Sequence, residues 1–277
     1  MLRSGNDAAV ALAQHIGGSI EKFADMMNKK AEELGLNSTH FVTPHGLDNS
    51  EHYTTAYELA KLTDYAMQNE KFAQIVGTKV TSIYINNQPR QIANTNELLG
   101  VLNGVVGVKT GFTNNAGRCL VTETKRNNMD IITVVLSADT KKDRTKDSVK
   151  LIEYAYSNYR MVNIQEKIIE EFNNWKNINE KRINVVQGKT EYLSLALGEI
   201  ELQTIPIKKN EIDNLEYEIN TISSIEAPIE KWSKIGSITV KLNDKIIENV
   251  EIINIEKIER KTWRDYFKCL LEKLTVK

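Results

Sequence analysis

The sequence contains no long hydrophobic run. Its longest apolar stretches, residues 8–13 and 131–136, are much shorter than the roughly 18 apolar residues that a membrane-spanning helix requires. It also lacks an excess of charge, since 36 basic and 37 acidic side chains leave a formal net charge of −1. Without a broad positive field, a protein is not concentrated on nucleic acid. We therefore expect neither a spanning helix nor a nucleic-acid partner.

Cysteine is scarce, and Cys119 and Cys269 lie far apart without a Cys-x-x-Cys spacing. This excludes a disulfide framework and a cysteine-based metal knot, so each cysteine is expected to act as a small buried hydrophobic residue. The first residues show no basic segment followed by an apolar one, so we expect no secretory signal within these residues.

A metal-binding pattern is missing as well. His40, His45 and His52 fall within one short region, but no carboxylate or cysteine completes a recognised ligand spacing around them. We expect no metal site and no cofactor.

The hydrophobic pattern of residues 1–160 alternates between helical and strand periods. Helices are predicted over 7–16, 20–34, 54–69 and 146–159, β segments over 78–85 and 105–110, and a hairpin from 118–124 and 130–137. Asn6 or Asp7 is expected to cap the first helix. Helices that flank an antiparallel sheet indicate an α+β domain.

The pattern changes in residues 161–258, where short β-branched segments are separated by turn residues. These segments are 164–172, 181–186, 191–196, 199–207, 215–222, 235–242 and 246–255. The spacing predicts a small all-β domain that resembles a sandwich.

Residues 259–277 form a third part. Large apolar side chains recur at helical spacing from residue 261 onward, and they are Trp263, Tyr266, Phe267, Leu270, Leu271 and Leu274. Basic residues surround this face, a pattern typical of a helix that lies in a membrane interface. An ordinary helix that docks on the β domain is the alternative.

Two short motifs carry chemistry. Ser4-Gly5-Asn6 directly precedes the first predicted helix, and Lys109-Thr110-Gly111 follows the apolar segment 105–108. In the second motif a cation and a hydroxyl project from one strand, while Gly111 leaves the backbone approachable. Taken alone, the first motif is explained as a helix cap.

The order of the two motifs resembles that of the penicillin-recognising serine enzymes. More closely, the chain resembles the serine-type D-alanyl-D-alanine carboxypeptidases, the low-molecular-weight penicillin-binding proteins. The resemblance rests on Ser4-Gly5-Asn6-Asp7-Ala8-Ala9, Pro44-His45-Gly46-Leu47, His52-Tyr53-Thr54-Thr55-Ala56 and Gly107-Val108-Lys109-Thr110-Gly111-Phe112-Thr113, continuing to Ala116-Gly117. It implies a penicillin-binding or β-lactamase-like domain with its N-terminal part missing, then a small β domain and an amphipathic anchor helix.

The resemblance also implies roles for individual residues in substrate binding. Lys109 would place a positive charge near the substrate carboxylate, and the Thr110 hydroxyl would hold that carboxylate. Arg144 falls where the family has a second carboxylate-binding cation, with a solvated surface charge as the alternative. Gly111 would lie beside the substrate, and the backbone N–H of Phe112 would be one oxyanion donor.

For catalysis, the resemblance implies that Ser4 relays a proton and that Asn6 orients the substrate's peptide carbonyl. The family's nucleophile and base form a Ser-x-x-Lys motif upstream of these residues, so we expect both to be absent from this sequence. Ser19-Ile20-Glu21-Lys22 matches the spacing, but we interpret Ser19 as a helix cap with Lys22 exposed. Without the missing part, the apolar face of the first helix is expected to be exposed and the domain to be unstable alone.

The predicted function is removal of the terminal D-alanine from peptidoglycan stem peptides through an acyl-enzyme, with β-lactam antibiotics as further ligands. The resemblance places the protein at the outer face of the bacterial cytoplasmic membrane, held by residues 261–277. A non-catalytic peptidoglycan-binding or membrane-surface protein is the main alternative, and a β-lactamase is another.

Overall fold

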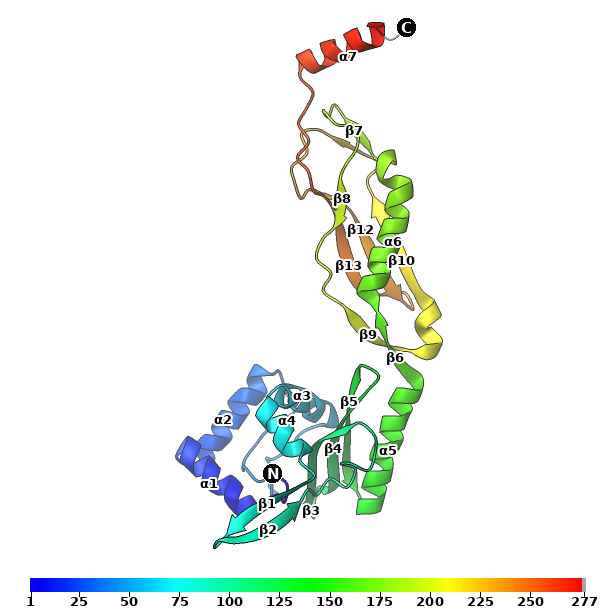
Figure 1. Ribbon diagram of the computed structural model, residues 1–277. Helices are drawn as coiled ribbons and strands as arrows, with labels where there is room; N and C mark the ends of the chain where they lie inside the picture. The colour runs from blue at the N-terminus through cyan, green and yellow to red at the C-terminus, as the bar shows by residue number, and fades with distance from the viewer. Residues whose placement is uncertain (276–277) are drawn as a thin grey trace. The chain divides into compact units, whose positions relative to one another are not determined.

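Two units, Met1–Ser157 and Asn158–Lys277, make up the computed structural model shown in Figure 1. The structure describes residues 1–275, without the side chains of Cys269 and of residues 272–275. The predictions made for Cys269, for Leu274 and for residues 276–277 therefore lie outside the described part of the chain.

A three-stranded antiparallel sheet in the order β3-β4-β5 is the centre of the first unit. The strands are β3 (Val105–Thr113), β4 (Gly117–Arg126) and β5 (Met129–Ala138). Asn127 and Asn128 form the β4–β5 turn with φ of 51° and 59°, the left-handed conformation that tight hairpins need. The predicted hairpin is confirmed.

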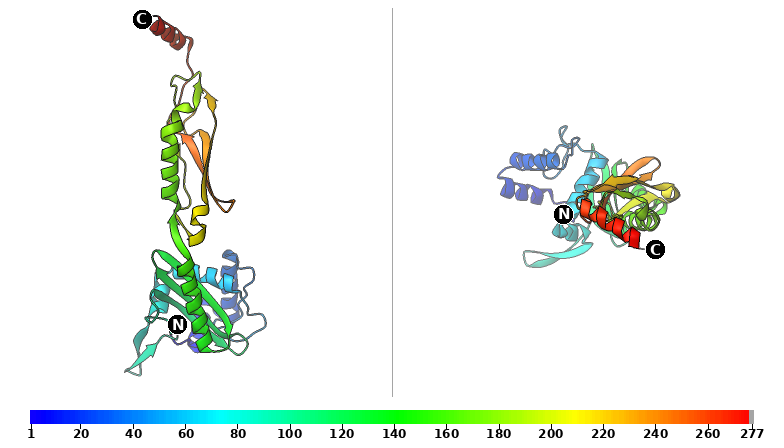
Figure 2. Two further views of the ribbon diagram at one scale, coloured as in Figure 1. Left: turned by 90° about the vertical axis from the view of Figure 1, so that its right-hand side faces the viewer. Right: turned by 90° about the horizontal axis from the view of Figure 1, so that it is seen from above.

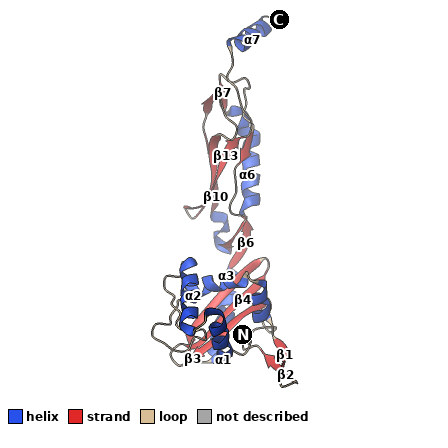
Figure 3. Ribbon diagram, turned by 90° about the vertical axis from the view of Figure 1, so that its left-hand side faces the viewer, coloured by secondary structure: helices blue, strands red, loops and turns tan. Residues whose placement is uncertain are grey.

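Helices cover both faces of this sheet. Successive residues of β4 point to opposite sides, so β4 contributes side chains to the core on each face. Leu120 packs against Ile152 of α5 (Lys141–Asn158). On the other face, Val121 packs with Val76 of α4 (Glu70–Gly77) and Leu59 of α3 (Ala56–Met67). Figure 3 shows the strands between these helices, and the α+β fold class is confirmed.

The chain enters this unit through α1 (Asn6–Gly17) and α2 (Ile20–Glu33), which lie side by side in Figure 1. The cap predicted at Asn6 or Asp7 is wrong. The helix starts one residue earlier with Gly5 as its N-cap, and Asp7 lies inside the first turn, where it accepts from the N–H of Ala8. The apolar side chains of Leu12 and Ile16 on α1 are exposed, as expected.

Between α3 and β3 the sequence prediction was incomplete, because it gave a single strand over 78–85. The structure has α4 and then a two-stranded ribbon of β1 (Val80–Ile85) and β2 (Gln88–Ala93). Asn69 caps α4 by accepting from the N–H of Phe72. The residues of the β1–β2 ribbon are almost all exposed, so hydrophobic periodicity did not reveal β2.

In the second unit, the strand predicted over 164–172 is wrong, because this segment begins helix α6 (Ile164–Asn179). Ile164, Ile168 and Phe172 recur every four residues and are all buried, which is a helical period rather than a strand period. Asn163 caps the helix by accepting from the N–H of Glu166.

Helix α6 runs along a four-stranded sheet, as Figure 2 shows. The sheet has the order β10-β12-β13-β8, formed by β10 (Leu215–Thr221), β12 (Lys234–Leu242), β13 (Lys245–Asn254) and β8 (Leu195–Leu197). Ile164 and Ile168 pack with Ile238 of β12 and Val250 of β13 in the core.

Short strand pairs complete this unit. These are β6 (Tyr159–Asn163) with β9 (Thr204–Lys208), and β7 (Asn184–Val186) with β11 (Ser224–Glu226). The 3-10 turn Glu180–Arg182 connects α6 to β7, and the 3-10 turn Lys209–Asn214 connects β9 to β10.

The predicted C-terminal helix is present as α7 (Trp263–Thr275). Its described large apolar side chains are exposed, and these are Trp263, Tyr266, Phe267, Leu270 and Leu271. Among the described residues, no helix combines the length and the apolar character that crossing a membrane requires.

Candidate substrate-binding site

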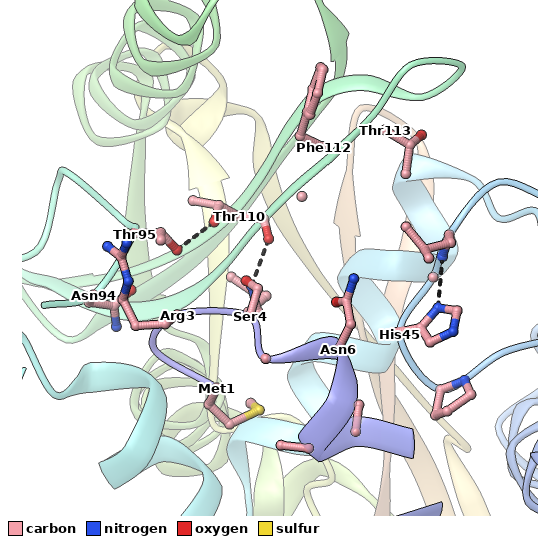
Figure 4. A pocket seen from close by; sticks show the side chains of 18 of the residues that line it. Met1, Arg3, Ser4, Asn6, His45, Asn94, Thr95, Thr110, Phe112 and Thr113 are labelled. Atoms are coloured by element: carbon pink, nitrogen blue, oxygen red, sulfur yellow. Dashed lines mark hydrogen bonds between the residues drawn. The ribbon is translucent and has the colours of Figure 1, made fainter. Parts of the chain in front are cut away.

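A cavity of about 830 Å³ lies in the first unit and brings together segments that are far apart in the sequence. Its wall includes the residues around the start of α1, the loop 44–47, residues 94–97, one end of β3 and the first turn of α5. Figure 4 shows Ser4 and Asn6 at the start of α1, opposite Thr110 on β3. The two sequence motifs therefore line one cavity.

Lys109 and Ser4 are in direct contact in this cavity. The Lys109 ammonium donates one hydrogen bond to the Ser4 hydroxyl and a second, of 2.8 Å, to the backbone carbonyl of Thr110. Partial burial lowers the pKa of Lys109, because removal of water disfavours the charged amine. Ser4 has a φ of 52°, a conformation uncommon outside glycine and asparagine.

Thr110 is held by a residue that the sequence analysis did not identify. Its hydroxyl oxygen lies 2.6 Å from that of Thr95, and both side chains line the cavity. The side-chain amides of its two neighbours, Asn94 and Asn96, hold the loop that contains Thr95 in place. Asn94 donates to the carbonyls of Val76 and Thr78, and buried Asn96 donates to that of Gly107. The polar run Asn94-Thr95-Asn96 was visible in the sequence, but its place beside β3 was not.

Arg144 lies in the first turn of α5 and also lines the cavity. Its side chain is buried, so the alternative of a solvated surface charge is wrong. The helix begins five residues earlier than predicted, at Lys141 instead of 146, because Thr140 caps it by accepting from the N–H of Asp143. An Arg144 Nη atom is 3.8 Å from a carboxylate oxygen of Glu97.

Burial also lowers the pKa of the Arg144 guanidinium. The carboxylate of Glu97 opposes this shift and the charge of Arg118 adds to it. Arg144 therefore carries its positive charge where water is partly excluded, and Glu97 is the one acidic side chain beside it in the described part of the chain. Such a cation is well suited to binding an anion.

Gly111 and Phe112 continue β3 along the cavity wall. Gly111 is paired with half-buried Cys119 on β4, and Phe112 is paired with Arg118. The Arg118 guanidinium lies 3.6 Å from the centre of the Phe112 ring. The sequence analysis did not identify Arg118 as part of the site.

The histidines have local roles. His45 lines the cavity and its Nδ1 accepts from the N–H of Leu47, while His52 accepts from the N–H of Val42. Burial lowers the pKa of His52, and nearby His40 and His45 add to that shift. Within the described part of the chain, no group of three or more His, Cys, Asp or Glu side chains is arranged to hold a metal ion.

The Ser-x-x-Lys match lies elsewhere. Ser19 caps α2 by accepting from the backbone N–H of Lys22, and neither residue is part of the cavity wall. The interpretation of Ser19 as a helix cap is confirmed.

The fold and the cavity define the class as a penicillin-binding-protein-like α+β domain followed by a smaller, mainly β domain. Comparison with known families gives the same result. Residues 1–140 match the D-alanyl-D-alanine carboxypeptidase family, and residues 176–260 match the C-terminal domain of penicillin-binding protein 5. The chain belongs to the D-alanyl-D-alanine carboxypeptidase family, and the resemblance to low-molecular-weight penicillin-binding proteins is confirmed.

The similarity to several curated relatives covers both domains of this chain. The chain is 33% identical to D-alanyl-D-alanine carboxypeptidase DacF of Bacillus subtilis over 89% of its own length and 61% of that protein. It is 32% identical to DacC of Escherichia coli over 94% of its own length and 62% of that protein. The chain thus spans about three fifths of the length of these curated relatives.

Comparison with solved structures also finds penicillin-binding proteins. Penicillin-binding protein 5 from Haemophilus influenzae matches with a TM-score of 0.66 and 28% identity, over 93% of this chain and 72% of that one. Penicillin-binding protein 6B from Escherichia coli matches with a TM-score of 0.65 and 27% identity, over 92% and 67%. Penicillin-binding protein D2 from Listeria monocytogenes, in a cefotaxime-bound form, matches with a TM-score of 0.50 and 32% identity, over 55% and 62%.

Proposed function

We propose that this chain serves in a serine-type D-alanyl-D-alanine carboxypeptidase, which removes the terminal D-alanine from peptidoglycan stem peptides through an acyl-enzyme. The observation that carries the proposal is the contact between Lys109 and Ser4 inside one cavity. The two motifs are far apart in the sequence, and each supplies a group that the reaction needs. β-Lactams are proposed as ligands of the same cavity, as the cefotaxime-bound relative supports.

In the proposed mechanism, the cations bind the substrate. Lys109 and Arg144 neutralise the terminal carboxylate, and the Thr110 hydroxyl donates to one of its oxygens. Thr95 keeps the Thr110 side chain in place through their 2.6 Å contact. The Asn6 amide orients the peptide carbonyl, and the backbone N–H of Phe112 stabilises the oxyanion.

Ser4 is suited to relay a proton. Because the Lys109 ammonium donates to the Ser4 oxygen, the hydroxyl hydrogen of Ser4 is directed away from Lys109 and is available to another acceptor. In the reaction that acceptor is the amine of the leaving D-alanine, and Ser4 takes a replacement proton from the lysine base, which has received it from the attacking serine. The attack itself requires a serine with a lysine base, which the family resemblance assigns to a Ser-x-x-Lys segment upstream of Ser4. Loss of such a nucleophile lowers turnover by about 10⁶-fold.

The proposed location is the outer face of the bacterial cytoplasmic membrane. The exposed aromatic and aliphatic side chains of α7, with Lys261 and Arg264 beside them, support an interfacial helix. Such a helix would keep the enzyme near the cell wall, where its substrate is.

Intact mass of the native protein after incubation with penicillin tests the proposed activity. One covalent adduct per protein, followed by slow release, supports the carboxypeptidase. A protein that binds stem peptide reversibly but forms no adduct would be a binding protein, and the catalytic assignment would then be wrong. Rapid hydrolysis of penicillin would instead indicate a β-lactamase.

A further inference from the structure

The cavity wall carries more positive charge than one substrate carboxylate balances. Among the residues that the structure describes, this wall contains a single acidic side chain, Glu97, and five basic side chains, which are Arg3, Lys109, Lys141, Arg118 and Arg144. Unbalanced cations around a concave surface attract anions and raise their local concentration. The terminal carboxylate of the proposed substrate supplies one negative charge, so a ligand with a second anionic group fits this cavity better.

Arg118 is the cation best placed for that second group. Arg126, Arg144 and Arg260 each face a carboxylate, whereas Arg118 forms no ion pair with any residue that the structure describes. Its guanidinium lies over the Phe112 ring, at 3.6 Å from the ring centre. Such a contact restricts the guanidinium to one position and leaves N–H groups at its edge free to donate.

The Arg118 guanidinium, over Phe112, lies further along β3 than Thr110, where the terminal carboxylate of the substrate is proposed to bind. Thr110 and Phe112 are two residues apart on the strand, which corresponds to about 6.6 Å. A peptide that lies extended along β3 with its terminal carboxylate at Thr110 advances by about 3.3 Å per residue. A side chain near Arg118 therefore belongs to the residue about two positions before the C-terminus.

We propose that Arg118, held over Phe112, binds a second carboxylate on the third residue from the C-terminus of the substrate and makes the site selective for acidic stem peptides. The proposal rests on the proposed function, because that function supplies the peptide and its terminal carboxylate. Arg118 acts here as a specificity-determining residue, and the contact is a charge-assisted hydrogen bond that adds to binding without changing the bond that is cleaved.

The test measures binding of two fluorescent peptides to the 277-residue chain by fluorescence anisotropy. Both peptides end in X-D-alanyl-D-alanine and carry a neutral linker to the fluorophore, with X either glutamate or its uncharged isostere glutamine. We expect the glutamate peptide to bind about tenfold more tightly, as expected for one charge-assisted hydrogen bond. This preference should decrease with added salt.

Variants of the chain link the preference to Arg118. In Arg118→Gln the two peptides should bind equally, while Arg118→Lys, which keeps the charge but not the planar fork, should retain a smaller preference. The matched control is Arg264→Gln, since Arg264 also lies over an aromatic ring, Trp263, but is not part of the cavity wall. It should leave the preference unchanged.

The outcomes separate this inference from the proposed function. Equal binding of both peptides to the unmodified chain, or an unchanged preference in Arg118→Gln, overturns the role of Arg118 but leaves the proposed function intact. A second pair of peptides, with the terminal carboxylate converted to an amide, tests that function. If the amides bind as well as the acids, or if no peptide binds, the proposed function is wrong and this inference is wrong as well.

Discussion

The hydroxyl oxygens of Thr95 and Thr110 lie 2.6 Å apart, which joins the loop after the β1–β2 ribbon to the strand that carries Lys109. One hydroxyl in such a pair donates and the other accepts, so Thr95 sets the direction in which Thr110 can donate. The site therefore depends on a residue outside both sequence motifs.

Replacement of Thr95 by valine should weaken the binding of D-alanyl-D-alanine peptides by about fivefold, because loss of one neutral hydrogen bond corresponds to about 1 kcal/mol. The measurement is the dissociation constant from fluorescence anisotropy. Thr95→Ser keeps the hydroxyl and should bind nearly as the unmodified chain does. Equal affinities for the valine and serine variants would show that Thr95 does not position Thr110.

Replacement of Lys109 by methionine should abolish peptide binding yet stabilise the fold at neutral pH. Burial lowers the pKa of Lys109 in the folded chain, so the charged amine is less favourable there than in the unfolded chain. At pH values between the lowered pKa of Lys109 in the folded chain and the ordinary lysine value of about 10.4, the unfolded chain binds more protons than the folded chain. The unmodified protein therefore gains stability as the pH rises through that window.

Thermal unfolding at pH 7 and at pH 10 measures this effect. The methionine variant should have the higher melting temperature at pH 7, and its advantage should be smaller at pH 10. An advantage that grows with pH would contradict the predicted direction. Lys141→Met serves as a control, since the Lys141 side chain is exposed and its replacement removes the same charge without burial.

Truncation of Ile168 in α6 should destabilise the second unit by about 3 kcal/mol, because a fully buried isoleucine leaves a cavity when it is cut to alanine. The matched control is Ile178→Ala in the same helix, where the side chain is 61% exposed and little stability should be lost. Urea unfolding followed by circular dichroism compares the two. Similar losses in both variants would contradict the packing of α6 against the sheet.

Interfacial binding of α7 should depend on its aromatic side chains. We expect anionic lipid vesicles to retain the full chain but not a chain that ends at Glu259, nor the double variant Trp263→Glu/Phe267→Glu. Trp232→Glu is the control, because Trp232 is 59% exposed but lies outside α7. Sedimentation with vesicles measures the bound fraction, and equal partitioning of all four proteins would exclude a membrane role for this helix.

The parts of the fold predicted from the sequence are those whose signals are local. The β4–β5 hairpin follows from two strand-like segments joined by a polar turn, and the cap of α2 follows from Ser19 directly before an amphipathic run. The segment that begins at Ile164 was interpreted wrongly because its β-branched content was weighted above its four-residue period. The β2 strand was missed because its exposed residues carry no hydrophobic pattern.

The residue types alone specify which groups are available for chemistry. Ser4, Asn6, Lys109, Thr110 and Arg144 were identified from motif order and resemblance, because the residue type alone defines a hydroxyl, an amide or a cation. All five line one cavity in the structure. Their roles in catalysis remain the prediction that the experiments above address.

The burial and the orientation of these groups follow from the packing of elements that are distant in the sequence. The contact of Lys109 with Ser4, the support of Thr110 by Thr95 and the position of Arg118 over Phe112 all join residues from different elements. Hydrogen bonds and burial act over a few ångströms, and neighbours at that distance are set by strand pairing and helix packing. The sequence motifs therefore name the groups of the site, while the fold sets their burial, their orientation and the position of Arg118, the further cation that we assign to substrate selection.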